Sequence, residues 1–305
     1  MMKRTKEMKE TLTGYAFVAP ALIVFTVLIA FPLIASILLS FTEWNFLSGI
    51  KNIKWVGLSN FANLLQDKRF VWGVKNTFIY AITTVPISIA IALVLAYVLN
   101  SDRVYGKKIL RLCFFIPYIS SAVALAAVFK AMFRENGAIN MILTEIFRMS
   151  HGLSWFSDFS LNKIPIIIFV IWSHIGFELI VYMAALQNVP KSLYEAADLD
   201  GASSFKKFWN ITFPMISPTT FYLVIVQFIT CFKIFTAINV MNYGDTAYSN
   251  TSIVVEVYEN AFTNYKFGYA SAEALVLFAI IILVTAISGG RRRGFIIKRG
   301  EHNYG

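Results

Sequence analysis

Charged residues are scarce in this chain: they form 14% of its 305 residues, against about 25% in an ordinary soluble domain. Apolar residues form 57%, above the roughly 45–50% that soluble domains contain. This composition excludes a disordered chain and a collagen-like fibre, and it argues against a cytosolic enzyme. The chain has instead enough apolar sequence for several membrane spans.

Cysteine and histidine are also rare. Cys113 and Cys231 lie inside apolar runs and are expected to be buried small hydrophobic residues, which excludes a disulfide scaffold. His151 and His302 are isolated, so we predict no metal site and no catalytic pair of nucleophile and base. A phosphate-binding GxxxxGK(S/T) loop is lacking, which excludes an ATPase.

Long apolar runs dominate what remains. A span needs about 20 apolar residues to cross about 30 Å of hydrocarbon, and it must be helical because a lone strand in lipid leaves its backbone groups unpaired. We therefore predict an all-α membrane protein whose residues 13–290 form one transmembrane domain of six helices. The predicted spans are Thr13–Phe41, Thr77–Leu99, Ile109–Met132, Ile164–Leu186, Phe213–Ala237 and Phe267–Ser288.

The distribution of basic residues predicts the orientation of these spans. With the N-terminus inside, 16 of the 27 Lys and Arg residues fall in the two tails and the inner loops, as the positive-inside rule requires. Tails 1–12 and 291–305 are therefore predicted to be cytoplasmic. The first span is too long for a signal peptide and has no cleavage-like end, so we expect it to be retained. The net charge of +10 follows from this topology, and nucleic-acid binding is not predicted.

The inner loop 190–212 is too ordered in pattern to be a plain linker. Ser192 and Glu195 have the spacing of a capping box, and Gly201 suits the position just after a helix. Ser203 or Ser204 can start a second short helix, and Pro214 marks the entry into the fifth span. The loop is thus predicted to be two short helices joined by a glycine bend. It is either a protruding contact element or an ordinary hairpin tucked under its own bundle.

At this point the sequence resembles a known family. Glu195-Ala196-Ala197, Asp200-Gly201-Ala202, Ile211 and Pro214 match the EAA motif of permease subunits of ABC importers, with Phe213 in place of the usual leucine. Further stretches resemble the maltose-type carbohydrate permeases, the first of their two subunits in particular. These stretches are Ala16–Ala21, Phe31-Pro32, Ser40–Asn45, Val56–Phe61, Ala185–Pro190 and Gly268–Ala272.

The resemblance implies a type I ABC importer permease in the prokaryotic cytoplasmic (inner) membrane. Its implied partners are a second homologous permease, two ATP-binding subunits that hold ATP and Mg, and an extracytoplasmic sugar-binding protein. The cytoplasmic EAA loop would couple the permease to the ATPases as a rigid lever. The coupling residues carried over by position are Glu195, Ala196, Ala197, Asp200, Gly201 and Ala202.

Polar residues inside spans are costly and mark a candidate substrate path. Lys233 and Glu273 are expected at similar depth, and His174 shares a helix face with Glu178. Lys233 and Glu273 either face the sugar or pair only with each other, or the Lys233 side chain extends to the membrane surface. The candidates for the path are Trp172, His174, Glu178, Tyr182, Gln227, Thr230, Lys233 and Glu273.

Two other classes of function stay open from the sequence. An ion-coupled secondary transporter could use Glu178, Lys233 and Glu273 as a proton relay and would work without ATPase partners. A membrane scaffold or receptor would have no transport path. The sequence does not identify the sugar, because importers of disaccharides, oligosaccharides, uronic-acid polymers and glycerol phosphate would share these features. The charges of Glu178, Lys233 and Glu273 would suit a charged or amine-bearing sugar.

Overall fold

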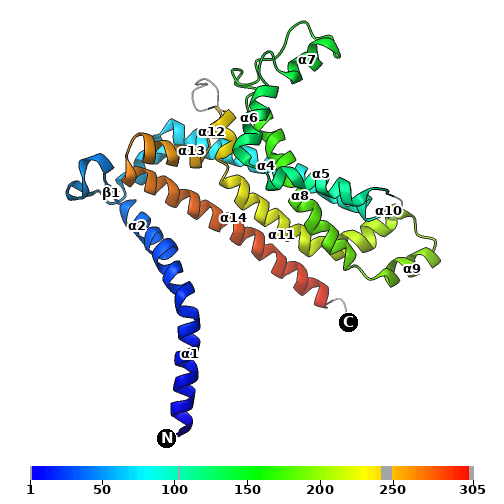
Figure 1. Ribbon diagram of the computed structural model, residues 1–305, viewed down its shortest axis with the longest axis horizontal. Coiled ribbons are helices and arrows are strands. Elements are labelled where there is room, and N and C mark those ends of the chain that lie inside the picture. The colour runs from blue at the N-terminus through cyan, green and yellow to red at the C-terminus, as the bar shows by residue number, and fades with distance from the viewer. Residues whose placement is uncertain (1, 102–103, 242–248, 302–305) are drawn as a thin grey trace. The chain divides into compact units, whose positions relative to one another are not determined.

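The computed structural model describes residues 2–101, 104–241 and 249–301 (Figure 1). Parts of the predicted first inner loop, last outer loop and C-terminal tail, at 102–103, 242–248 and 302–305, lie outside these residues. The chain divides into two units, residues 1–67 with 257–278 and residues 68–256 with 279–305. In the described part, five helices are long and apolar enough to cross a membrane, and one bent pair of helices makes up to a sixth span.

The first unit is built on one long helical rod followed by a small outer layer. The rod consists of α1 (Met2–Phe25), η1 (Thr26–Ala30) and α2 (Phe31–Leu39), and its span Thr13–Leu39 buries none of its apolar window in this chain. The outer layer pairs β1 with β2 antiparallel, Thr42 opposite Trp55. Its elements are β1 (Thr42–Glu43), η2 (Phe46–Ser48), η3 (Ile50–Asn52), β2 (Lys54–Trp55), α3 (Ser59–Gln66), η5 (Glu259–Thr263) and the start of α14 (Phe267–Glu301).

A π-helical turn precedes a proline at two places in the chain. Pro32 lacks an N–H and its ring would meet the carbonyl four residues earlier, so η1 widens the helix just before it. Pro214 has the same position after η4 (Phe208–Thr212). In both places the wider turn lets the helix continue through the proline.

The second unit has a core of three helices: α4 (Lys68–Asn100), α8 (Ile164–Gln187) and α11 (Phe213–Phe232). The most extensive helix contacts join α4 to α8, α5 (Lys107–Ile119) to α8, and α11 to α4. Small residues on α4 allow the close approach that holds helices together in lipid. The buried positions of α4 include Ala81, Val85, Ala92 and Ala96.

The third predicted span is broken, which corrects the prediction of one straight helix over Ile109–Met132. It consists of α5 and α6 (Ala122–Met132), which are bent by 98° at a short break. Pro117 weakens the end of α5 because it lacks an N–H, and Ser121 starts α6 by accepting a hydrogen bond from the amide of Ala124 at 3.4 Å.

The fifth predicted span, Phe213–Ala237, ends too late. Helix α11 stops at Phe232 and α12 (Thr236–Met241) begins after a break. The hydroxyl of Ser252 donates to the carbonyl of Ile234 at 2.9 Å and so satisfies a backbone group inside the break. The second predicted span, Thr77–Leu99, starts too late, because α4 already begins at Lys68.

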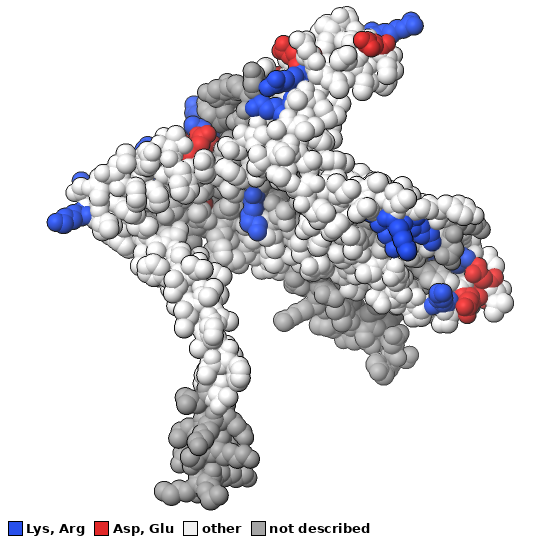
Figure 2. All heavy atoms as spheres, in the orientation of Figure 1, with Lys and Arg blue, Asp and Glu red and all other residues white. Residues whose placement is uncertain are grey.

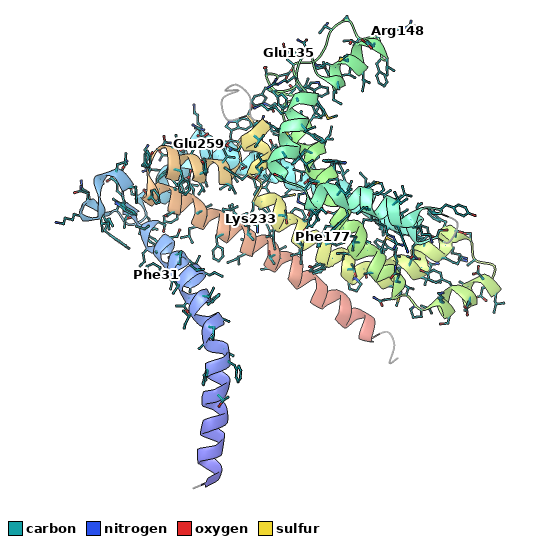
Figure 3. The ribbon with its side chains drawn as sticks, viewed as in Figure 1. Phe31, Glu135, Arg148, Phe177, Lys233 and Glu259 are labelled. Atoms are coloured by element: carbon teal, nitrogen blue, oxygen red, sulfur yellow. The ribbon has the colours of Figure 1, made fainter. Side chains whose placement is uncertain are left out.

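The predicted outer loop Phe133–Lys163 forms an extension that carries α7 (Ala138–Glu145), as Figure 3 shows beside the labelled Glu135 and Arg148. Buried Asn140 holds this extension together. Its amide donates to the carbonyls of Arg134, Glu135 and Leu153, and its oxygen accepts from the amide of Leu153 and from the indole of Trp155. The side chain of Asn140 thus links two segments of the extension to each other.

The segment before α13 (Ile253–Tyr258) is held against α4 by hydrogen bonds. Asn76 donates to the carbonyl of Thr251 at 3.0 Å, and Tyr80 donates to the carbonyl of Asn250 at 3.2 Å. Lys163 donates to the carbonyl of Ser249, and its burial lowers its pKa, with nearby Lys75 lowering it further. These bonds satisfy a stretch of buried, irregular backbone.

Helix α3 buries only part of its apolar surface. Leu64 is buried and Phe61 is half-buried, whereas Leu65 is 80% exposed. The exposed position follows from the helical turn, since Leu65 lies 100° round the axis from Leu64.

Candidate functional site

The inner loop folds into α9 (Lys191–Leu199), a glycine turn and α10 (Ser204–Lys207), with α10 continuing through η4 into α11. Gly201 has φ +67°, and its amide donates to the carbonyl of Asp198 at 3.1 Å. The amide of Ala202 donates to the carbonyl of Ala197 at 2.9 Å. These two bonds form a Schellman motif, so the predicted position of Gly201 just after the helix is confirmed.

The start of this loop differs from the prediction. Pro190 occupies the position before α9 and no side chain caps the helix, so the predicted capping box of Ser192 and Glu195 is wrong. Since α9 already begins at Lys191, the hydroxyl of Ser192 lies inside the first turn, where it cannot act as a cap. The second helix starts as predicted, because the hydroxyl of Ser203 accepts from the amide of Lys206 at 3.3 Å. Helix α10 is not a separate short helix, however, because it continues through η4 into α11.

Helix α9 protrudes and is tied to the rest of the loop at two points. The hydroxyls of Tyr194 and Thr212 lie 2.8 Å apart, and the ammonium of Lys207 lies 2.6 Å from a carboxylate oxygen of Asp198. The apolar side chains of Leu193 and Leu199 are 41% and 91% exposed. Figure 2 shows charged side chains of both signs gathered over α9 and α10. This loop is thus an ordered protrusion rather than a hairpin tucked under the bundle.

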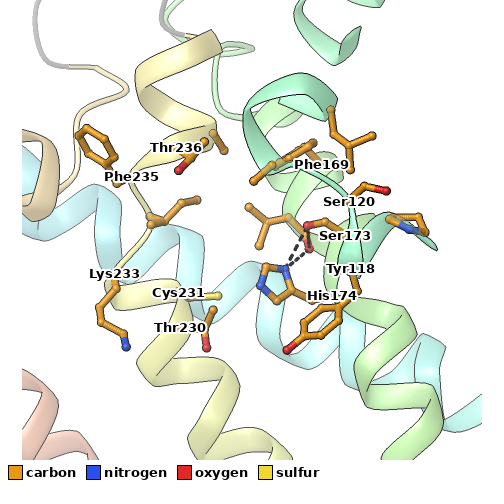
Figure 4. A pocket seen from close by; sticks show the side chains of 16 residues that line it. Tyr118, Ser120, Phe169, Ser173, His174, Thr230, Cys231, Lys233, Phe235 and Thr236 are labelled. Atoms are coloured by element: carbon orange, nitrogen blue, oxygen red, sulfur yellow. Dashed lines mark hydrogen bonds between the residues drawn. The ribbon is translucent and has the colours of Figure 1, made fainter. Parts of the chain in front are cut away.

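The second feature is a cavity of about 240 Å³ in the second unit, shown in Figure 4. It lies where both helix breaks meet, between the junction of α5 with α6 and the junction of α11 with α12. Its walls carry five hydroxyl groups, one imidazole and one ammonium group among mainly apolar side chains. The polar lining residues are Tyr118, Ser120, Ser173, His174, Thr230, Lys233 and Thr236.

Three of the predicted path residues line this cavity. His174 and Thr230 face each other across it in Figure 4. The Nδ1 atom of His174 lies 2.8 Å from the carbonyl of Val170 and 3.1 Å from the hydroxyl of Ser173, which fixes the ring. Lys233 is exposed at the end of α11, and its ammonium points away from His174.

Three other predicted path residues lie in the helix core instead. Glu178, Tyr182 and Gln227 are buried and do not line the cavity. The hydroxyl of Ser88 on α4 donates to Oε1 of Glu178 at 3.0 Å. His174 and Glu178 therefore follow one another on α8 but differ in environment, since one faces the cavity and the other faces α4.

The two remaining candidates have separate places. Trp172 packs against Phe129 with ring centroids 5.2 Å apart and ring planes tilted by 34°, and it is 38% exposed. Glu273 belongs to the first unit, where the amide of Asn260 donates to its Oε1 at 2.9 Å. Sequence reasoning missed Tyr118, Ser120, Ser173 and Thr236. Pro117 followed by Ser120-Ser121 was the signal that could have revealed the break and hence the cavity.

Among the residues that the structure describes, no group of three or more His, Cys, Asp or Glu side chains could hold a metal ion. The cavity also brings together no nucleophile with a carboxylate-oriented base. What it offers is a set of hydroxyl donors and acceptors beside aromatic faces, which suits binding rather than covalent chemistry.

Comparison with known proteins adds independent findings. Residues 61–290 match the family model described as "Binding-protein-dependent transport system inner membrane component". The chain is 31% identical to the probable ABC transporter permease protein YesP of Bacillus subtilis (strain 168), covering 94% of this chain and 92% of YesP. It is also 31% identical to the lactose transport system permease protein LacF of Rhizobium radiobacter, covering 90% and 91% of the two chains.

A solved structure has the same fold. A chain of the bacterial alginate ABC transporter, crystallised in complex with an alginate pentasaccharide-bound periplasmic protein, superposes with a TM-score of 0.82. The superposition covers 95% of this chain and 97% of that chain, at 22% sequence identity.

Proposed function

This chain belongs to the family of binding-protein-dependent transport system inner membrane components and is thus a multi-pass permease of such an importer, and we propose that its cargo is a sugar or oligosaccharide. The observation that carries this proposal is the hydroxyl-lined cavity between the two helix breaks. Sugars present hydroxyl groups that both donate and accept, and the cavity offers the same. The lactose permease relative supports the same class of cargo.

The position of the cavity suits a translocation path. Broken helices within a membrane leave backbone groups unpaired, and they persist where those groups are buried in protein or line a cavity that holds water or substrate. Tyr118 and Phe169 add aromatic faces on which a pyranose ring can stack. The cavity, at about 240 Å³, is smaller than the roughly 300–1,000 Å³ of complete ligand sites. A second permease therefore completes the path.

The loop around Gly201 is the proposed contact with the ATPases. The two ATP-binding subunits dock on the EAA helices of the permease pair, and α9 is this chain's part of that contact, with the apolar side chains of Leu193 and Leu199 exposed to a partner. ATP and Mg are held by those subunits, and this chain contributes no catalytic step. Glu195, Ala196, Ala197, Asp200, Gly201 and Ala202 form the coupling element.

The orientation is part of the same proposal. Both termini face the cytoplasm of a prokaryotic cell, and an extracytoplasmic protein delivers the sugar to the opposite side. The basic residues of the tails and inner loops support this direction.

Thr230→Val is expected to lower the apparent kcat/KM for ATP-driven uptake by about 2- to 10-fold, the effect of losing one hydrogen bond to the cargo. Uptake is measured in liposomes that contain the assembled transporter, its binding protein and ATP. The matched control is Thr285→Val, because Thr285 makes the same i−4 bond to a backbone carbonyl as Thr230 but lies outside the cavity.

The same liposomes discriminate between classes of function. Uptake by the purified chain alone, driven by a proton gradient, would contradict the ATP-driven reading and favour a secondary transporter. No stimulation of ATPase activity by any loaded binding protein would favour a scaffold.

A further inference from the structure

The first unit contains a polar groove that the transport path does not explain. It has a volume of about 550 Å³, and all its lining residues belong to this unit. Three segments form its walls: the end of β1, one face of α3, and the residues that lead into α14. The side chains of the groove used below are Glu43, Trp44, Asn63, Asp67 and Lys266.

Specific hydrogen bonds fix the positions of the segments that form the groove. The amide of Asn60 on α3 donates to the carbonyls of Ser40 and Thr42, both at 2.9 Å. The hydroxyl of Tyr269 on α14 donates to Asp67 at 2.9 Å. A Cβ on Gly268 would lie 2.0 Å from the carbonyl oxygen of Thr42, so only glycine permits this approach of α14 to β1.

Other groups in the groove remain available to a ligand. Glu43, Asn63 and Lys266 are exposed, and the described residues offer none of these side chains a hydrogen bond or an ion pair. The indole ring of Trp44 borders the groove and is held by Phe267, at 5.6 Å between ring centroids, and by a bond from its N–H to the carbonyl of Gly49 at 3.2 Å. The groove is thus a prearranged set of unused acceptors and donors beside a fixed aromatic ring.

This set of groups selects one class of ligand. Carboxylates accept, an ammonium donates and a carboxamide does both, which matches the vicinal hydroxyls of a sugar. The groove is lined by two carboxylates, Glu43 and Asp67, and one ammonium, Lys266, and this excess of negative charge opposes a phosphate or sulfonate. Trp44, Val56 and Tyr269 add apolar surface to the groove beside these polar groups. Its volume is that of a small-molecule site.

We propose that this groove is a second binding site, for a neutral sugar, separate from the cavity in the membrane. The two sites belong to different units of the chain and share no residue. The groove lies beyond the outer end of the first span in the orientation proposed above. It therefore holds sugar on the extracytoplasmic side and does not depend on the ATPases.

Calorimetry on the full-length chain in nanodiscs tests the proposal, with glucose, lactose, maltotriose and raffinose as neutral probes and glycerol 3-phosphate as the anionic one. We expect at least one neutral probe to bind, and Asn63→Leu to weaken that binding by about fivefold or more, since it removes a donor and an acceptor. Gln66→Leu is the matched control because Gln66 is an exposed amide on the same helix outside the groove.

The possible results distinguish sugar binding in the groove from binding in the membrane cavity. Binding by none of the neutral probes, binding of the anionic probe alone, or equal binding by Asn63→Leu and wild type overturns the proposal. Loss of binding in Thr230→Val with no loss in Asn63→Leu also overturns it, because that pattern places the sugar in the membrane cavity only. None of these results measures ATP-driven uptake, which the liposome experiment tests, so the import function is tested separately from the groove.

Discussion

Replacing Gly201 with valine is expected to lower ATP-driven uptake and cargo-stimulated ATPase activity by at least about tenfold, while the protein still inserts into the membrane. Gly201 has φ +67° and closes the Schellman motif after α9. A left-handed conformation costs about 1–2 kcal/mol for an ordinary residue and more for a β-branched one. Valine therefore opens the turn that fixes the direction of α9, and the proposed lever loses its stiffness.

Two controls separate backbone strain at this turn from the bulk of an added side chain and from backbone strain elsewhere in the chain. Gly201→Asn is expected to keep most of the uptake, because asparagine tolerates the left-handed region. Gly106→Val introduces the same strain at φ +71° in the other inner loop, also with open space around the new Cβ, and should leave coupling intact. Wild-type uptake in Gly201→Val, or equal losses in Gly201→Val and Gly106→Val, would remove the special role of this turn.

Replacing Gly176 with valine is expected to disrupt the packing of α5 on α8 and to lower the Tm of the purified chain by roughly 5 °C or more. A Cβ on Gly176 would lie 2.2 Å from the carbonyl oxygen of Phe114 and 2.8 Å from the Cα of Phe115. Both are backbone atoms, so the clash is relieved only if the helices separate. Because α5 leads into the cavity at Tyr118 and Ser120, substrate binding should fall together with stability.

Melting of the chain in detergent micelles, followed by circular dichroism, measures the effect. Gly176→Ala should already lower the Tm, since the first added carbon makes the clash. Gly14→Val serves as the control because a Cβ on Gly14 meets nothing within 4 Å. An unchanged Tm in Gly176→Val would show that α5 does not approach α8 as closely as the structure has it.

Some features of the site were predictable because they depend on neighbours in sequence. The glycine after α9 and the serine before α10 were predicted from local capping chemistry, and both are confirmed. The capping box at Ser192 was wrong because α9 begins at Lys191, directly after Pro190, which is two residues earlier than a cap at Ser192 implies. The breaks near Ser120 and Lys233 were missed because apolar composition continues through them.

The sequence by itself determined that this is a membrane protein with several apolar helices, since the length and composition of each run suffice for that. It also determined the EAA loop, whose spacing is local. Only the tertiary structure decided which polar residues face a cavity. His174 and Glu178 have equivalent positions in the helical repeat, yet Glu178 is buried in the core, where the hydroxyl of Ser88, ninety residues away in the sequence, donates a hydrogen bond to its carboxylate. The environment of a side chain depends on which distant helix packs against it, and no local pattern contains that information.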